Sequence, residues 1–292
     1  MTVATEAFVT HRNLLFTVAY EMLGSAADAE DVLQETWLRW VDVDLGAVRD
    51  QRAYLVRIAT RLALDRLRSL GRRKESYVGS WLPEPLLTAP DVAEDVELAD
   101  SVSMAMLLVL ETLAPTERAV FVLREVFDLP YDEIAEAVDK SPAAVRQIAH
   151  RARAHVAERR PRDVVSPAET RAALDAFRRA IETGAMQDLF DILAPDVVLL
   201  SDGGGLSHSV PRPITGAAKV MRLLAAGMPK VSGQASIEPV QVNGCPALIL
   251  RLGSGHVTVI AVRIDDGLIT GLYFVRNPAK LSRVKQETSL TR

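Results

Sequence analysis

The residues best suited to chemical recognition lie in the segment 142–156, where basic and polar side chains recur at helical spacing. Arg146, His150 and Arg153 fall at i, i+4 and i+7 and therefore share one helix face. Arginine can donate two hydrogen bonds to guanine and glutamine can pair with adenine, so such a face can read bases in a DNA major groove. The alternative is a basic surface helix that is merely solvated. The side chains are Arg146, Gln147, His150, Arg151 and Arg153.

A second basic segment, 52–74, combines cations with aromatic side chains. Cations interleaved with aromatics suit a nucleic-acid backbone whose bases are unstacked. Asp65 follows Arg61 by four residues and is expected to pair with it on the helix surface. A solvated surface helix is again the alternative. The candidate contact residues are Tyr54, Arg57, Arg61, Arg66 and Arg68.

The net charge of −4 conceals a segregated distribution. Residues 49–74 carry nine basic and two acidic side chains, and residues 140–162 carry seven and one. Between them, residues 75–139 carry two basic and fifteen acidic side chains. Two short basic blocks therefore lie within an otherwise acidic N-terminal half, a pattern that the net charge alone does not reveal.

Other classes of site lack their patterns. The five histidines are far apart, without cysteine or paired carboxylate at ligand spacing, so no metal site is expected. No phosphate-binding loop and no cofactor motif occurs. The single cysteine, Cys245, cannot form an internal disulfide, which fits a reducing cytoplasm. No apolar run reaches 18 residues, and the first residues lack the layout of a signal peptide, so no membrane association is expected.

The elements that must position these side chains follow from periodicity and turn signals. Helices are expected through residues 6–74 and 101–158, with the pair 131–138 and 142–156 forming a helix-turn-helix. Residues 75–100, with three prolines and seven acidic residues, predict a linker that is extended at first, its Trp81-Leu82 pair anchored on an apolar surface. Hairpin signals at Asn243-Gly244 and Asp266-Gly267 and β-branched runs predict a curling antiparallel sheet after 168, hence an α+β domain. The expected divisions are 1–74, a linker 75–100, 101–160, a linker 161–167, and 168–292.

Two long motifs give a specific resemblance. DAEDVLQETWLRW (28–40) followed by RAYLVRIATRLALDRLRS (52–69) resembles region 2 of extracytoplasmic-function (ECF) bacterial RNA polymerase sigma factors. Residues 113–156 resemble region 4 of the same family. WLPEP (81–85), DGGG (202–205) and the 277–281 segment resemble the ECF group with a fused C-terminal SnoaL-like domain.

The resemblance implies two all-α modules, the second a helix-turn-helix, followed by an α+β SnoaL-like curved sheet. The helix 52–69 would hold the melted −10 promoter element, and the helix 142–156, with Lys140 and Ser141 before it, would read the −35 element. The helix 28–40 would bind the β′ clamp helices of core RNA polymerase. The acidic linker would run through the polymerase channel. The implied polymerase-binding residues are Asp28, Asp31, Gln34 and Glu35.

The C-terminal domain is expected to regulate the sigma regions in place of a separate anti-sigma factor. The sequence departs from the family pattern in having Leu206 after DGGG and Ala279 within NPAKL. SnoaL-like folds enclose an apolar pocket, which could take an unknown small ligand, and Asp202, His208 and His256 are the candidates for pocket chemistry. Regulation is favoured over catalysis, and no catalytic residue is assigned. The expected interdomain residues are Trp81, Asp202, Gly203, Gly204, Gly205, Asn277, Pro278 and Lys280.

Two other functions are compatible with the same residues. One is a DNA-binding regulator that carries a small-molecule or isomerase- or cyclase-like pocket domain. The other is a repressor that binds duplex DNA without polymerase. A sigma factor is distinguished from both by promoter-dependent transcription with core RNA polymerase.

Overall fold

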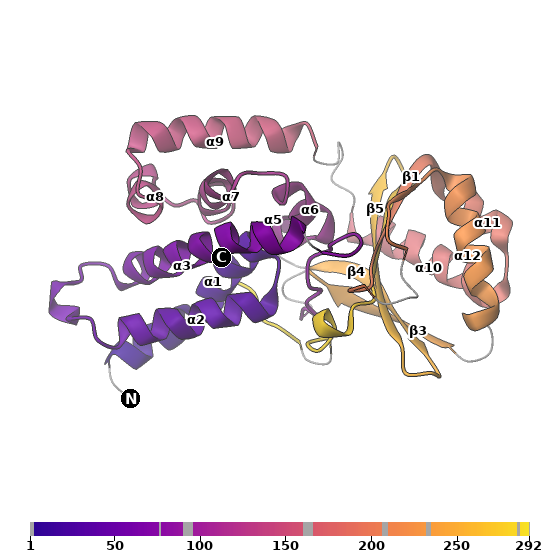
Figure 1. Ribbon diagram of the computed structural model, residues 1–292, viewed down its shortest axis with the longest axis horizontal. Coiled ribbons are helices and arrows are strands. Elements are labelled where there is room, and N and C mark those ends of the chain that lie inside the picture. Colours follow the sequence, from indigo (N-terminus) through magenta and orange to yellow (C-terminus); the bar gives the residue numbers. More distant parts are fainter. Residues whose placement is uncertain are drawn as a thin grey trace.

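The computed structural model describes residues 3–75, 77–89, 96–159, 166–205, 210–231, 235–284 and 287–291. A helical half built from the first 159 residues lies beside a half built on a single sheet (Figure 1). The fold class expected from the sequence, helical modules followed by an α+β domain, is confirmed. The domain limits expected above remain predictions.

The first helical module consists of α1 (Val3–Leu23), α2 (Ala26–Trp40) and α3 (Gln51–Glu75), with a short 3-10 turn at Leu45–Ala47. Ser25 caps α2 by accepting a hydrogen bond from the Asp28 amide, as expected of serine before a helix. Trp40 ends α2 fully buried, and its indole nitrogen donates to the Ala4 carbonyl at 2.8 Å. The three helices therefore share one apolar core.

The second module contains α5 (Val96–Val102), α6 (Met104–Leu110), α7 (Pro115–Phe121), a π-helical turn (Val122–Val126), α8 (Tyr131–Val138) and α9 (Pro142–Ala157). The helices expected over 131–138 and 142–156 are confirmed. Asp139 ends α8 in the left-handed conformation, and Ser141 caps α9 through the Ala144 amide at 3.2 Å. One expectation is wrong in detail, because α5 begins at Val96, inside the stretch assigned to the linker.

The C-terminal half has α10 (Pro167–Thr183), α11 (Met186–Asp191), α12 (Ala217–Val231) and a 3-10 turn (Pro278–Lys280) around a six-stranded sheet. The strands are β1 (Leu193–Asp202), β2 (Ile214–Thr215), β3 (Ala235–Val242), β4 (Cys245–Leu252), β5 (Val257–Asp265) and β6 (Leu268–Val275), in the order β2-β1-β6-β5-β4-β3. The antiparallel expectation is wrong for one pair: β1 and β6 run parallel. The intervening α12 and β3–β5 supply the long connection that a parallel pair requires.

The sheet buries both of its faces because side chains alternate along each strand. Leu199, Leu272 and Phe274 pack under α10–α12. The neighbouring residues Tyr273 and Val275 turn the other way and pack with Leu82 and Met104. The sheet thus joins the linker and α6 on one side to its own helices on the other.

Asn243, in the β3–β4 turn, connects the sheet to both helical modules. Its side-chain amide donates to the Tyr20 hydroxyl of α1 at 2.6 Å and to the Val102 carbonyl of α5 at 2.9 Å. Its side-chain oxygen accepts the Leu86 amide of the linker at 2.9 Å. The residue is fully buried at φ +55°, a left-handed conformation that asparagine tolerates. A hairpin turn predicted for local reasons therefore also holds three segments together.

Asn243→Ala should lower stability by about 2–3 kcal/mol, because it leaves the buried Leu86 amide and Val102 carbonyl without partners. The matched control is Asp266→Ala, at the exposed β5–β6 turn with φ +51°, which carries only the backbone cost. Denaturant unfolding of both variants measures the difference. Equal losses in the two variants would show that the buried amide contributes nothing beyond its turn.

Candidate functional site

The basic face of α9 is open to solvent. Helix α9 lies along the outer edge of the helical half (Figure 1), and its inward face is made by Val145, Ala149, Ala152 and Val156. All seven residues expected at the −35 element are exposed, although the Ser141 hydroxyl is used as the helix cap. They are Lys140, Ser141, Arg146, Gln147, His150, Arg151 and Arg153.

Acidic and aromatic neighbours hold the α9 arginines in place. Arg153 pairs with Glu125 at 3.0 Å, and Arg151 lies 3.7 Å from Glu117. The Arg146 guanidinium lies 5.6 Å from the centroid of the Tyr131 ring, which belongs to α8. These contacts are solvent-exposed and therefore weak, so each arginine can exchange its partner for a base or phosphate at small cost.

The basic face of α3 is, in contrast, partly covered by α8. Arg57 pairs with Glu136 at 2.8 Å and lies over the Tyr54 ring, while Arg61 donates to the Glu136 carbonyl at 2.7 Å. Figure 1 shows α8 beside α3. The expected Arg61–Asp65 pair is wrong, since Asp65 pairs with Arg68 at 3.1 Å instead. Tertiary contact with α8 takes precedence over the weak local pair.

Arg66 belongs with the α2 residues rather than with the rest of the α3 set. It pairs with Asp28 at 2.6 Å and Asp31 at 2.5 Å. Burial of Arg66 acts against its charge, but these two carboxylates outweigh that effect and raise its pKa. One residue expected at DNA thus joins two expected at polymerase.

The exposed surface of α2 carries the remaining candidates for polymerase contact. Asp31, Gln34 and Glu35 are exposed, and Glu35 pairs with Arg39 at 2.7 Å. Leu38, 59% exposed, lies one helical turn after Gln34 and was not singled out from the sequence. A large apolar side chain beside carboxylates on a helix suits a protein partner.

The interdomain residues converge on Asp202, at the end of β1. Its carboxylate is fully buried and accepts hydrogen bonds from the Tyr77 hydroxyl at 2.5 Å, the Leu82 amide at 2.9 Å and the Gly204 amide at 3.1 Å. Lys280 forms an ion pair with it at 2.7 Å. Burial lowers the pKa of Lys280, and the Asp202 charge opposes that shift. We call Asp202, Tyr77, Leu82, Asn277 and Lys280 the Asp202 cluster.

The rest of the cluster closes around the linker. Lys280 also donates to the Leu82 carbonyl at 2.5 Å and lies 4.2 Å from the centroid of the Trp81 ring. Asn277 donates to the Tyr77 hydroxyl at 2.9 Å, which orients that hydroxyl toward Asp202. Five of the eight residues expected between domains are thereby brought together: Trp81, Asp202, Gly204, Asn277 and Lys280. Gly203 is buried beside them, while Gly205 and Pro278 are exposed.

Two glycines allow the close approach of these segments. A Cβ on Gly204, which has φ +62°, would lie 2.7 Å from the Asn277 side chain. A Cβ on Gly24, between α1 and α2, would lie 2.8 Å from the Trp81 ring. Gly204 was expected at the interdomain contact because it belongs to DGGG, whereas Gly24 was not singled out from the sequence.

Glu84 and Tyr77 are further residues that sequence reasoning missed. The Glu84 carboxylate is buried at the start of α2 and accepts the amides of Ala26 at 2.8 Å and Ala27 at 3.3 Å. A carboxylate there satisfies amides that the helix leaves open. The position of Glu84 within the WLPEP motif was the sequence signal that could have identified it. Its charge was instead counted only among the acidic residues of the linker.

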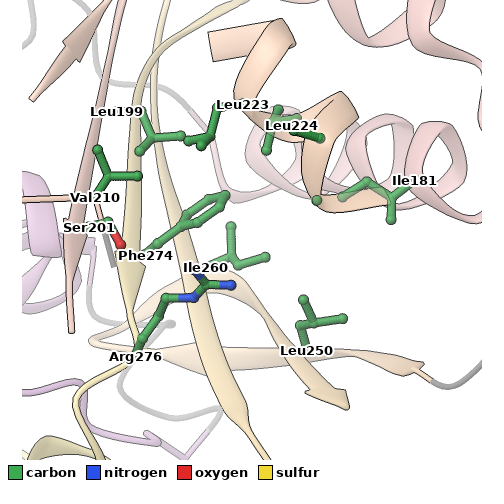
Figure 2. Close-up of a pocket in the computed structure, with 12 residues that line it drawn as sticks. Ile181, Leu199, Ser201, Val210, Leu223, Leu224, Leu250, Ile260, Phe274 and Arg276 are labelled. Atoms are coloured by element: carbon green, nitrogen blue, oxygen red, sulfur yellow. The ribbon is translucent and has the colours of Figure 1, made fainter. Parts of the chain in front are cut away.

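The two described candidates for pocket chemistry, Asp202 and His256, lie in different parts of the C-terminal half. Asp202 lies on the face of the sheet that carries the cluster, and His256 lies exposed between β4 and β5, 2.9 Å from the Ser254 hydroxyl. His208 and Leu206 are outside the described residues. A cavity of about 260 Å³ opens between the sheet and α12 (Figure 2), lined by apolar side chains with Ser201 and Arg276. Among the described residues, no group of three His, Cys, Asp or Glu could hold a metal ion, and no helix is long and apolar enough to span a membrane.

Comparison with known proteins identifies two regions in the helical half of the chain. Residues 7–73 match the family description Sigma-70 region 2, and residues 103–156 match Sigma-70, region 4. The chain is 34% identical to the ECF RNA polymerase sigma factor SigJ of Mycobacterium tuberculosis, over 94% of this chain and 92% of that one. It is 31% identical to the probable ECF RNA polymerase sigma factor SigI of that species, over 96% of both chains.

A solved structure extends the similarity to the whole fold. The crystal structure of Mycobacterium tuberculosis SigJ superposes with a TM-score of 0.76 and 31% identity, covering 96% of this chain and 98% of that one. The coverage includes the C-terminal sheet as well as both helical modules. On the two region matches and the full-length relatives, this chain belongs to the ECF RNA polymerase sigma factors.

Proposed function

We propose that this sigma factor binds core RNA polymerase through α2 and directs initiation by reading the −35 element with α9 and the melted −10 strand with α3. The observation that carries the proposal is the exposed basic face of α9. Helix α9 lies on the opposite side of the helical half from α2 (Figure 1). A major groove accepts such a helix, and its arginines reach base edges. The −10 role of α3 needs aromatic and cationic side chains, which Tyr54 and Arg57 supply.

The C-terminal domain modulates this activity by favouring the arrangement seen in the structure, in which α3 of region 2 and α8 of region 4 contact each other. We call it the closed arrangement. In the closed arrangement α8 engages Arg57 through the Glu136 carboxylate and Arg61 through the Glu136 carbonyl, so these contacts must break before both arginines can hold single-stranded DNA. The Asp202 cluster and Asn243 bind the linker between the two regions, and the tail adds an ion pair from Arg283 to Glu30 at 3.3 Å. A fused domain with these contacts substitutes for a separate anti-sigma factor, which is not expected.

The chain contributes no bond-breaking chemistry of its own. The polymerase makes the phosphodiester bond. The buried carboxylate of Asp202, a candidate for pocket chemistry, forms an ion pair with Lys280. We expect the protein to act in the cytoplasm beside its polymerase and DNA. In the complex with core polymerase and promoter DNA, the acidic linker leaves the sheet and runs through the polymerase channel. Its negative charge prevents it from binding the DNA there.

Run-off transcription tests the function directly. Purified chain plus core RNA polymerase should give a promoter-dependent transcript, and core alone should not. The free chain should bind duplex promoter DNA weakly until core is added. Tight duplex binding without core, and no transcript with it, would favour the repressor over the sigma factor.

Arg146→Ala should weaken −35 recognition by about 1–3 kcal/mol and relax preference at one or two bases, because a bidentate contact is lost. The control is Arg171→Ala, which removes an exposed arginine from α10. Transcription from promoters randomised at −35 gives both quantities. An unchanged base preference would remove Arg146 from the reading set.

Glu136→Ala should increase binding of a single-stranded −10 oligonucleotide to the free chain by about two- to fivefold, since an exposed ion pair contributes up to roughly 1 kcal/mol. Asp132→Ala is the control, because it removes the same charge from an exposed position of α8. Fluorescence anisotropy measures the affinity. Equal effects of both substitutions would mean that charge alone, and not release of Arg57 from α8, changes binding.

A further inference from the structure

The cavity between the sheet and α12 is apolar along most of its wall. Leu199, Ile260 and Phe274 line it from the sheet, and Leu223 and Leu224 line it from α12 (Figure 2). Its volume is about 260 Å³. Because a cavity of roughly 150 Å³ accommodates benzene, this one suits a body of about ten non-hydrogen atoms.

Ser201 places a hydroxyl group at one end of this apolar wall. It follows Leu199 by two residues along β1, so the two side chains lie on the same face of the sheet. Ser201 pairs with Phe274 in the sheet register, and Phe274 pairs with Ile260, so the hydroxyl ends a row of side chains from neighbouring strands. The residue is 2% exposed, and its hydroxyl has no hydrogen-bond partner among the described residues. A buried hydroxyl without a partner lowers stability, and an oxygen atom of a ligand would recover that loss.

The charged residue near this hydroxyl already has partners within the chain. Arg276 lines the same cavity, and one of its partners is the Thr258 hydroxyl, 3.3 Å from its Nε. An anion that enters an apolar cavity loses its water and needs several donors in exchange. The Ser201 hydroxyl donates one hydrogen bond, which suffices for a carbonyl oxygen but not for a carboxylate. The site therefore favours a neutral ligand.

We propose that the cavity binds a small neutral molecule that is apolar apart from one carbonyl oxygen, which accepts a hydrogen bond from the Ser201 hydroxyl. The body of the ligand packs against Phe274 and against the leucines of α12. Ketones and esters of about ten non-hydrogen atoms, built on one aryl ring or a short aliphatic chain, have this chemistry and size.

Ser201 also connects the cavity to the Asp202 cluster. It directly precedes Asp202, and the side chains of the two residues lie on opposite faces of the sheet. The Arg276 amide donates to the Asp202 carbonyl at 2.7 Å, which fixes the end of β1 against the end of β6. A ligand on Ser201 restrains this strand end further. Resting on the proposed function, this geometry makes the ligand a regulator of how firmly the linker is held.

Methyl NMR titration of the full chain with acetophenone tests the site without polymerase. We expect shifts of the Leu199 and Leu224 methyl signals and a dissociation constant of roughly 20–500 µM, within the ligand-efficiency limits for about nine atoms. Ser201→Ala should weaken acetophenone binding by about 5- to 50-fold, because the buried carbonyl then has no donor. It should not weaken binding of α-methylstyrene, a hydrocarbon of the same shape. The control Ser236→Ala, exposed on β3, should change neither affinity.

Two further measurements check the chemistry of the site. Benzoate should bind at least about tenfold more weakly than acetophenone, because the cavity does not replace the water of a carboxylate. Ser201→Ala should raise the midpoint of denaturant unfolding of the ligand-free chain, because it removes a buried hydroxyl without a partner.

Equal effects of Ser201→Ala on acetophenone and α-methylstyrene, or tighter binding of benzoate, would overturn the site. A lower unfolding midpoint for Ser201→Ala, or no methyl shifts below about 5 mM acetophenone, would also overturn it.

Hydrogen exchange of the Leu82 amide, which donates to Asp202, measures the coupling to the linker. We expect this exchange to slow by about threefold or more when acetophenone saturates the cavity, because the strand end is restrained. Binding without that change would overturn the coupling. Failure of run-off transcription with acetophenone binding intact would overturn the proposed function and leave the site standing.

Discussion

The arrangement depends on one buried charge, the carboxylate of Asp202. A carboxylate with no solvent contact is stable only if hydrogen bonds and a cation replace its water. Here the linker supplies a hydroxyl and an amide, the chain after β6 supplies the Lys280 cation, and the following glycine loop supplies another amide. Because two of these donors belong to the linker, the charge is fully satisfied only when the linker lies on the sheet. Detaching the linker therefore exposes this charge to water, where it no longer requires those partners.

Such a contact can be released as readily as it is made. Buried ion pairs contribute little net stability because desolvation offsets attraction, but they define geometry closely. The apolar cluster around Leu82 and Met104 adds non-directional attraction to the same interface. The Arg57–Glu136 ion pair between α3 and α8 is exposed and weak by comparison. Regions 2 and 4 are also held together directly, because their helices share one apolar core and the buried Arg118 of α7 donates to the Glu21 carbonyl of α1 at 2.9 Å. The sheet and the linker add to this direct contact.

Periodicity and caps anticipated much of the fold, because helix boundaries at Ser25, Ser141 and Pro142 depend on local chemistry. The α9 face and the group around Asp202 were also expected, the second through resemblance rather than from spacing. Local sequence signals do not determine which helices, strands and loops pack against one another. Asn243 was predicted as a turn residue, Glu84 was counted only among the acidic residues of the linker, and Gly24 was not singled out. Each of them nevertheless contacts a segment distant in sequence. The pairing of Arg57 and Arg61 with α8, and the parallel β1–β6 pair, are likewise long-range outcomes.

The proposed function requires the C-terminal domain to hold regions 2 and 4 together until core polymerase and promoter DNA bind them. This can be tested by pulsed electron resonance, as the distance between spin labels at Leu38 on α2 and His150 on α9 in a Cys245→Ala background. We expect one short distance distribution for the free chain, and a longer one in the transcriptionally active complex with core polymerase and promoter. Asp202→Ala should shift part of the free population toward the longer distance. The same distribution in the free chain and in an active complex would show that the C-terminal domain does not hold the two regions together.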